Sequence, residues 1–404
     1  MITLAIETSC DETAVCLLET LGGNPPDSTT YPYTILGNII HSQVELHRQY
    51  GGVFPAMAKR EHSKNLLPLL EALIKESNID MIDCPPKNTD SGTFLNFLKE
   101  KESELFENFL KSPFLSKKPA SINQIAVTRG PGLEPALWVG VNCARALSIL
   151  WDIPLVGINH MEGHILGSLL DSTEINKKQV LRAVAFPALA LLVSGGHTEL
   201  VLVKKIGDYE MIGRTKDDAV GEAYDKVARM LGLPYPGGIE IQNRAEKARA
   251  AAKKINISLP RPMIHSHNLD FSFSGLKTAV LYTLRGDKSG GSSETPAMTV
   301  SDDMRAAIAC EFENAVTDVL IAKTQKALEK YPAQSLILGG GVSANKYIRS
   351  AFEKLATQNS IPLYLPPAGV SGDNALMIAL AAAVSPQSKP LTEDTLRAHG
   401  NLSL

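Results

Sequence analysis

The chain repeats one strand pattern in its two halves, and this repeat constrains the fold more than any other feature. The pattern is an apolar strand, a turn of small or polar residues, a returning strand and a third strand. In the first half these segments are 3–8, 9–13, 14–18 and 34–40. In the second half they are 188–193, 194–198, 199–205 and 209–215. Two such meanders, with helical sequence between them, predict an α/β protein with two similar lobes. Chance similarity between hairpins is the alternative.

The composition is that of an ordinary globular protein. The 404 residues are 44% apolar and 21% charged, which is enough for two domains and a large core. No apolar run reaches the roughly 20 residues that cross a bilayer. A strand pattern begins at Ile2, which leaves no room for a signal or transit peptide, and the five cysteines form no CxxC pair. We therefore expect a cytoplasmic protein with no membrane partner. Because the net charge is only −3, contacts with nucleic acid would need local patches or partner proteins.

Two histidines four residues apart, His160 and His164, follow an apolar strand that ends at Ile158. If the chain becomes helical there, both imidazoles share one face and can hold one transition metal. The plain alternative is a helix start with two hydrogen-bonded histidines. Two histidines alone make a weak site, and Asp373, beside Gly372 at a predicted helix start, is the best candidate for a third ligand. Two histidines with one carboxylate suit iron or zinc and leave positions open for a substrate.

The same pair resembles the zinc ligands of a metalloprotease, but two details oppose proteolysis. A zincin has glutamate directly after the first histidine, whereas here Met161 is at that place and Glu162 follows. Gly163 also weakens the helix that such a site needs. A metalloprotease therefore stays a poorly supported alternative.

Three glycine turns, at 194–196, 236–238 and 339–341, expose backbone N–H groups that no side chain obstructs. Such turns can approach a phosphate or a planar ligand closely. Each alone is a weak signal, but three in one half favour a nucleotide-type ligand. No GxxxxGK[ST] motif occurs, which disfavours the P-loop NTPases.

Acidic residues supply candidates for proton transfer. Asp11 and Glu12 lie in the first polar turn, where they are either merely solvated or able to act on a metal, a water or an attacking amine. Asp225 lies on a helix predicted at 218–231, where an ion pair with Arg229 is the plain alternative.

Three other stretches carry no chemistry that the sequence assigns. Residues 81–118 form a polar, irregular insertion with one amphipathic stretch at 94–110. Residues 285–299 form a Gly/Ser-rich loop. A basic helix at 239–254 offers phosphate contacts, although a solvated basic face is the simpler interpretation.

Short motifs stand at intervals along nearly the whole chain. The principal ones are IETSCDET at 6–13, HMEGH at 160–164, LVSGGHT at 192–198, GGGVSAN at 339–345 and SGDN at 371–374. Further ones are GGVFP at 51–55, PGG at 236–238 and DFSFSGLK at 270–277. Jointly they resemble one family, the bacterial-type tRNA adenosine threonylcarbamoyltransferases, formerly described as O-sialoglycoprotein endopeptidases or glycoproteases.

This resemblance implies an α/β fold of two actin-like lobes, each a sheet with helices, as in the actin-like ATPases (the ASKHA, ribonuclease H-like fold). The first lobe would comprise 1–184, with the insertion at about 81–118. The second would comprise 185–404, with its last helix crossing back to the first.

The resemblance also implies the roles of individual residues. The metal ligands are His160, His164 and Asp373, holding one divalent ion per subunit, iron or zinc. Asp11 and Glu12 correspond to acidic residues near the reaction centre. The residues that bind threonylcarbamoyl-adenylate are Leu192, Val193, Ser194, Gly195, Gly196, Asp225, Gly238 and Asn345.

The implied activity is that of an acyltransferase. It transfers the threonylcarbamoyl group from threonylcarbamoyl-AMP to the exocyclic amine of the adenosine 3′ of the anticodon, in tRNAs that read ANN codons. The implied partners are tRNA, a paralogous subunit and a small ATPase. Three alternatives stay open: a small-molecule kinase or ATPase of the same fold, a metalloprotease, and a non-enzymatic scaffold that retains the nucleotide fold.

Overall fold

The computed structural model describes residues 1–21, 31–84, 88–171, 174–175, 177–251, 257–285, 301–385, 388–391 and 395–404. From residue 286 onward, the loop predicted at 285–299 lies outside the described residues. The chain forms two compact units, each described by itself below. Unit 1 comprises Met1–Glu45, Val53–Val184 and Gly372–Leu404, and unit 2 comprises Leu46–Gly52 and Ala185–Ser371. No helix among the described residues is long and apolar enough to cross a membrane.

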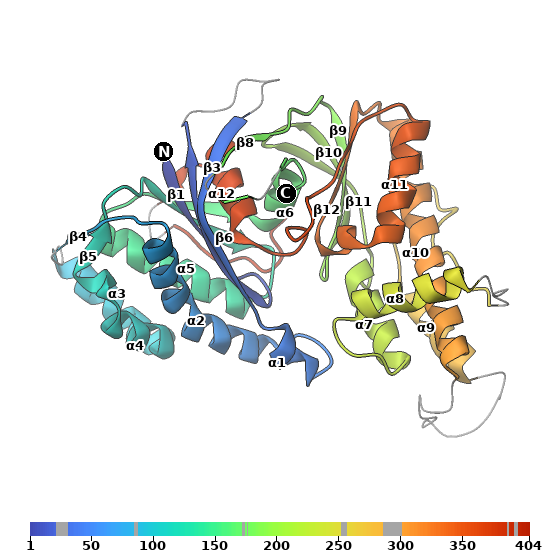
Figure 1. The fold of residues 1–404 in the computed structure, drawn as a ribbon, viewed down its shortest axis with the longest axis horizontal. Helices are drawn as coiled ribbons and strands as arrows, with labels where there is room; N and C mark the ends of the chain where they lie inside the picture. The colour runs from blue at the N-terminus through green and yellow to red at the C-terminus, as the bar shows by residue number, and fades with distance from the viewer. Residues whose placement is uncertain are drawn as a thin grey trace. The chain divides into compact units, whose positions relative to one another are not determined.

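Unit 1 is built on a seven-stranded sheet with the order β14-β7-β6-β1-β2-β3-β8 (Figure 1). The strands are β1 (Ile2–Glu7), β2 (Glu12–Thr20), β3 (Tyr31–Ser42), β6 (Gln124–Gly130), β7 (Leu155–Asn159), β8 (Lys178–Leu181) and β14 (Pro390–Leu391). The first three form an antiparallel meander, while β6 and β7 run parallel to β1. The apolar runs of β1 and β6 are buried, as expected of central strands covered on both faces.

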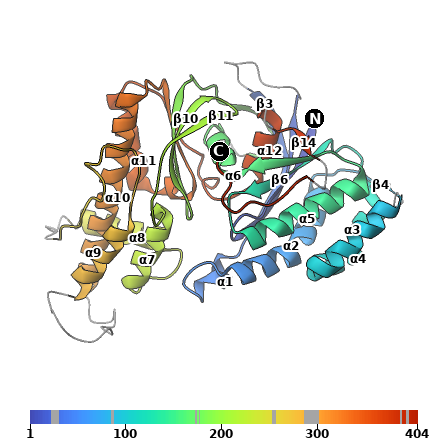
Figure 2. The same cartoon turned by 180° about the vertical axis from the view of Figure 1, so that it is seen from behind.

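Helices cover both faces of this sheet. On one face lie α2 (Pro55–Glu76) and α5 (Glu134–Trp151), and on the other lie α6 (His160–Gly167) and α12 (Ala375–Val384) (Figures 1 and 2). Every residue of α12 is buried, because this almost wholly apolar helix packs between the sheet and α6. A short helix, α1 (Val44–Arg48), follows β3.

The predicted insertion at 81–118 is more ordered than the sequence indicated. It contains a strand pair, β4 (Met81–Asp83) with β5 (Lys117–Pro119), two helices, α3 (Asn88–Lys101) and α4 (Ser103–Lys111), and a 3-10 turn, η1 (Pro113–Leu115). Leu98, Leu105 and Phe109 are fully buried where these helices pack against α2 and α5. The expectation of an irregular segment was wrong because packing against α2 and α5, which the local sequence does not show, stabilises these helices.

Unit 2 repeats the sheet order of unit 1. Its sheet runs β11-β10-β9-β12-β13. The strands are β9 (Ala188–Val193), β10 (Thr198–Lys205), β11 (Asp208–Arg214), β12 (Ser335–Gly339) and β13 (Leu363–Tyr364). Again three antiparallel strands are followed by two parallel to the first. In both sheets the first five strands along the chain thus lie in the order third, second, first, fourth, fifth. In unit 1, β8 and β14 extend this sheet at its two edges. This duplicated order is that of the actin-like, ribonuclease H-like fold, and the predicted fold class is confirmed.

The helices of unit 2 pack on this sheet around a core that includes Phe271, Phe273 and Phe312. They are α7 (Val220–Met230), α8 (Gly237–Ala250), α9 (Ser274–Arg285), α10 (Asp302–Lys330), the 3-10 turn η3 (Gly341–Ala344) and α11 (Lys346–Gln358). The helix predicted at 218–231 begins two residues later, at Val220, because Ala219 before it is extended (φ −68°, ψ 158°).

Candidate active site

The turn from β7 into α6 places the two predicted histidines on one helix face. Asn159 caps the helix, since its Oδ1 accepts hydrogen bonds from the N–H groups of Met161 (2.9 Å) and Glu162 (3.4 Å). His160 and His164 follow on the first turns, with 4% and 3% of their surface exposed.

Gly163 lets this helix approach α12 closely. A Cβ atom at Gly163 would lie 3.1 Å from side-chain atoms of Met377 and Ile378, closer than ordinary van der Waals contact. The expected weakening of α6 by this glycine is offset by that packing, and all eight residues of the helix are buried. Since α12 begins just after Asp373, the same contact brings this aspartate to the histidines.

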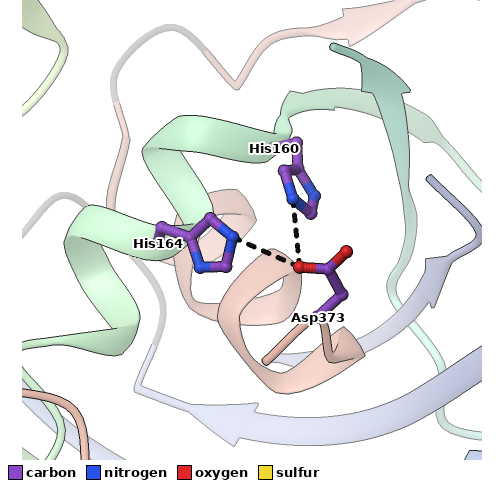
Figure 3. A group of neighbouring side chains, drawn as sticks. All are labelled: His160, His164 and Asp373. Atoms are coloured by element: carbon purple, nitrogen blue, oxygen red, sulfur yellow. Dashed lines mark ion pairs between the residues drawn. The ribbon is translucent and has the colours of Figure 1, made fainter. Parts of the chain in front are cut away.

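The three predicted metal ligands converge within unit 1. Asp373 Oδ1 lies 3.3 Å from His160 Nε2 and 3.3 Å from His164 Nε2 (Figure 3). One ligand atom from each residue lies within 4.8 Å of the others. Figure 3 shows both rings turned toward the one carboxylate, which comes from a segment more than 200 residues further along the chain.

This donor set fits a divalent metal ion. Donors about 2.0–2.1 Å from a tetrahedral ion lie roughly 3.3–3.4 Å from one another, and the distances to Asp373 Oδ1 match that spacing. The buried Nε2 of His164 makes no hydrogen bond with any described residue, although Asp373 is near. A buried polar atom without a hydrogen bond is costly, and a metal would satisfy it.

Glu7, at the end of β1, orients the first histidine. Its Oε2 lies 3.0 Å from His160 Nδ1 and accepts a hydrogen bond from Thr128 Oγ1, while its Oε1 accepts one from the backbone N–H of Ser9. Glu7 is fully buried, so these contacts hold the carboxylate in place. A carboxylate on Nδ1 leaves Nε2 as the donor toward a metal.

The charges of this cluster are coupled. Burial opposes a charge on His160, but the carboxylates of Asp373 and Glu7 outweigh it and raise the pKa of His160 well above its usual value. Burial lowers the pKa of His164. Burial also disfavours the Asp373 carboxylate, yet His160 and His164 together hold the pKa of Asp373 well below its usual value. The aspartate is therefore ionised, as a metal ligand must be.

The two acidic residues of the first turn lie in the same unit, and Glu12 is close enough to Asp373 to feel its charge. Asp11 is 6% exposed. Burial, followed by the neighbouring Asp11 and Asp373, raises the pKa of Glu12 well above its usual value. A raised pKa makes the ionised carboxylate a stronger base.

The residues predicted to bind the adenylate all belong to unit 2. Leu192 and Val193 are buried in β9, and Ser194 begins the turn, where its N–H donates to the His197 carbonyl (2.9 Å). Gly195 and Gly196 have nothing within 4 Å of the place a Cβ would occupy. Their backbone is thus open to a ligand on that side.

Two further turns of unit 2 each pack closely against a neighbouring element, one against β9 and the other against α7. Gly340 has φ +88°, and a Cβ there would lie 2.3 Å from the carbonyl oxygen of Val193, so only glycine fits. Asp225 Oδ1 accepts a hydrogen bond from Gly237 N–H at the start of α8 (2.7 Å). This contact, which the sequence did not predict, ties α7 to the turn that carries Gly238. A Cβ at Gly238 would meet nothing within 4 Å.

Asn345 caps α11 and binds a buried carboxylate. Its Oδ1 accepts from Ile348 N–H (3.0 Å), and its Nδ2 donates to Glu313 Oε1 (2.6 Å). Glu313 is fully buried in α10, and its other oxygen accepts from Arg249 Nη1 (2.6 Å). These two partners fix the amide orientation and leave one N–H of Asn345 for a ligand.

The structure therefore brings together His160, His164 and Asp373, with Asp11 and Glu12 nearby, and places the predicted adenylate residues on the other unit. Sequence reasoning assigned no role to Glu7 or Glu313. An acidic residue that ends an apolar strand was a signal for Glu7. The sequence around Glu313 contains no such signal, since this residue is one of several charged residues along a helix.

Comparison with known proteins identifies the family. The profile of the tRNA N6-adenosine threonylcarbamoyltransferases matches residues 34–85 and 104–380. A protein of that name from Polynucleobacter necessarius subsp. necessarius is 40% identical over 389 residues, covering 95% of this chain and 92% of its own. One from Bacillus subtilis is 39% identical over 386 residues, covering 95% and 90%.

Solved structures match at much lower identity. Full-length HypF in a phosphate- and nucleotide-bound form is 12% identical, with a TM-score of 0.47, covering 95% of this chain and 45% of HypF. The sequence relatives, by contrast, match along nearly their whole length. The chain belongs to the tRNA N6-adenosine threonylcarbamoyltransferases, a family of transferase enzymes.

Proposed function

We propose that this enzyme transfers threonylcarbamoyl from threonylcarbamoyl-AMP to the exocyclic amine of the adenosine 3′ of the anticodon in tRNAs that read ANN codons. The observation that carries the proposal is the convergence of His160, His164 and Asp373, with two acidic residues nearby, in a chain of this family. Family membership supports the tRNA adenosine acceptor, and the glycine turns of unit 2 support an adenylate donor.

The three converging side chains would hold one divalent ion, iron or zinc. When bound there, the ion supplies positive charge that polarises an oxygen of the acyl group. His160 and His164 contribute neutral nitrogens, and Asp373 contributes one negative charge, which leaves a net positive centre. Glu7 fixes the ring of His160, so that Nε2 faces the site.

The reaction needs an acceptor for one proton and a leaving group for one electron pair. The nitrogen of the adenosine amine forms a bond to the carbamoyl carbon, and the bond from that carbon to the phosphate oxygen breaks. AMP leaves with the electron pair, and the amine loses one proton. Glu12, whose pKa is raised by burial and by Asp11 and Asp373, is the favoured acceptor, with Asp11 as the alternative. The activated donor makes a covalent enzyme intermediate unnecessary.

The adenylate would be bound by residues of unit 2. Gly195, Gly196 and Gly238 offer open backbone, and Asn345 offers the one amide N–H that its own partners leave available. The backbone of Leu192, Val193 and Ser194 would contribute at the end of β9, and Asp225 would act through the Gly237 turn that it holds. Open glycine backbone suits the close approach of a phosphate.

The proposal includes the lobes, the location and the partners expected from the sequence. The two functional lobes would be 1–184 and 185–404, with the last helix of the chain crossing back to the first lobe. The enzyme would be cytoplasmic and would work with a paralogous subunit and a small ATPase. With a net charge of −3, the chain has no general electrostatic attraction for the polyanionic tRNA. A partner would therefore contribute to tRNA binding.

A transfer assay tests the proposal. Threonylcarbamoyl-AMP labelled in its threonine is incubated with the enzyme, candidate partners and an ANN-decoding tRNA, and label in the tRNA is counted. A tRNA with guanosine in place of the target adenosine should take up none. His160→Ala and Asp373→Ala should abolish both metal binding and transfer.

ATP-dependent phosphorylation without transfer would favour the kinase, and histidine-dependent cleavage of a protein would favour the protease. Transfer that survives both substitutions would refute the metal site.

A further inference from the structure

One buried histidine of α2 holds the acidic turn after β1 at both of its ends. His62 is fully buried. Its Nε2 lies 3.0 Å from the carbonyl oxygen of Cys10, and its Nδ1 lies 2.7 Å from Thr13 Oγ1. Cys10 and Thr13 directly flank Asp11 and Glu12. A single imidazole therefore contacts the chain immediately before and immediately after the two acidic residues.

Gln43, which follows β3, supports the same turn. Its backbone N–H donates to the carbonyl oxygen of Asp11 (2.9 Å). Its side-chain Nε2 donates to the Ala58 carbonyl (3.4 Å) and lies 3.4 Å from His62 Nδ1. The carbonyl groups of Cys10 and Asp11 are thus both bound by donors of neighbouring elements, so the turn does not depend on water for its shape.

The partners of His62 define its protonation. A carbonyl oxygen only accepts, so Nε2 carries the proton that is donated to Cys10. The Gln43 amide donates to the Ala58 carbonyl, which turns its NH₂ group toward His62 Nδ1. In this arrangement Nδ1 accepts from the Gln43 amide and from the Thr13 hydroxyl. His62 thus links α2 to the turn through both ring nitrogens, each of which lies within hydrogen-bond distance of a partner.

We propose that His62 is a positioning residue for acyl transfer: it keeps Asp11 and Glu12 in place beside the metal-ligand cluster. This inference rests on the proposed role of those two carboxylates. The support is rigid, because α2 is anchored by Leu66 and Leu70, both fully buried in the core of unit 1. A displacement of about 1 Å in a catalytic group can cost on the order of 100-fold in rate.

Three substitutions at one position test the contact. His62→Ala is expected to lower kcat about 100-fold, while KM for threonylcarbamoyl-AMP and for tRNA, and the affinity for zinc, stay within about threefold of wild type. His62→Gln places an amide near Nε2 and can still donate to Cys10, so it should recover at least about tenfold of the lost kcat. His62→Asn places its amide near Nδ1, lacks that donor, and should not recover it. If His62→Ala does not fold, the Gln and Asn pair decides.

Thiol labelling reports on the turn without reference to activity. Cys10 is partly exposed, whereas the other four cysteines are buried. Burial, with Asp11 and Asp373 nearby, raises the pKa of the Cys10 thiol and keeps it poorly reactive. Loosening of the turn in His62→Ala should therefore speed the labelling of Cys10 by a disulfide reagent. Leu147→Ala, in α5 and equally buried in the core of unit 1 but outside α2, is the control for lost stability and should change neither labelling nor kcat.

The inference is overturned if His62→Ala keeps kcat within about threefold of wild type, or if His62→Gln is no better than His62→Asn. It is also overturned if Leu147→Ala changes kcat and Cys10 labelling as much as His62→Ala does. Asp11→Asn and Glu12→Gln, assayed alongside, separate the two proposals. If both keep full kcat, the role of the acidic residues is wrong, whereas faster Cys10 labelling in His62→Ala still shows that His62 holds the turn.

Discussion

Glu7 Oε2 lies 3.0 Å from His160 Nδ1, while the Nε2 of the same ring lies 3.3 Å from Asp373 Oδ1. The imidazole thus lies between two carboxylates. Glu7 is fully buried, and Asp373 lies between the two histidines. The first sets the tautomer and orientation of the ring, and the second is the carboxylate proposed to bind the same metal. Removing the first should therefore weaken metal binding without deleting a ligand.

We expect Glu7→Gln to reduce zinc affinity about 10- to 100-fold, the usual effect of losing a partner that orients a metal-binding histidine. Competition with a chromogenic chelator measures this directly. Glu102→Gln is a matched control, because Glu102 is also a buried carboxylate of unit 1, paired with Lys59 at 3.1 Å. Unchanged zinc affinity in Glu7→Gln, or an equal loss in both variants, would contradict the orienting role.

Two adjacent glycines should respond differently to alanine. At Gly340, φ is +88° and a Cβ would lie 2.3 Å from the Val193 carbonyl oxygen. We expect Gly340→Ala to lower the free energy of unfolding by about 2–4 kcal/mol. At Gly341 a Cβ would meet nothing within 4 Å, so Gly341→Ala should change it by less than about 0.5 kcal/mol. Urea unfolding compares the two, and equal effects would mean that Gly340 is not constrained as described.

Glu199 in β10 should make stability fall as pH rises. Burial raises the pKa of Glu199 to about 7, against the opposing effect of Arg214. Between its ordinary value near 4.5 and about 7, the folded state holds a proton that the unfolded state has lost, so deprotonation destabilises the folded state. The pKa rise corresponds to a loss of up to about 3 kcal/mol, complete above pH 7.

Glu199→Gln removes this titration. Its free energy of unfolding should exceed that of wild type by about 2 kcal/mol at pH 8 and approach it near pH 5. Urea unfolding at pH 5, 6, 7, 8 and 9 measures both profiles, which should run parallel above pH 8. A wild-type profile that rises between pH 5 and 7 relative to the variant would have the opposite sign and exclude the effect.

Glu313 should be important for the stability of unit 2. It is fully buried and pairs with Arg249 and Asn345, each at 2.6 Å. Glu313→Ala leaves both partners without their acceptor, and we expect a loss of about 3 kcal/mol in the free energy of unfolding. Glu329→Ala, at an exposed site of the same helix, should cost less than about 0.5 kcal/mol. Similar thermal unfolding of the two variants would refute this prediction.

Local sequence predicted much of the fold. The strand alternation and turn residues located both meanders, and the predicted helix at 218–231 corresponds to α7 (Val220–Met230). The i, i+4 spacing of His160 and His164 placed them on one helix face, because 3.6 residues make a turn. The insertion was misjudged, since the burial of Leu98, Leu105 and Phe109 depends on distant helices that a local pattern does not reveal.

The sequence by itself determined the strand order within each meander, the paired histidines and the family, because these depend on residues close together in the chain or on motifs as such. Only the tertiary structure decided that Asp373 Oδ1 lies 3.3 Å from both imidazoles, that Glu7 faces the other side of His160, and that His62 binds both ends of the acidic turn. Each of these contacts joins residues at least 49 positions apart in the chain, the separation of Thr13 and His62. Local propensity carries no information on such pairs, which depend on how sheets and helices pack.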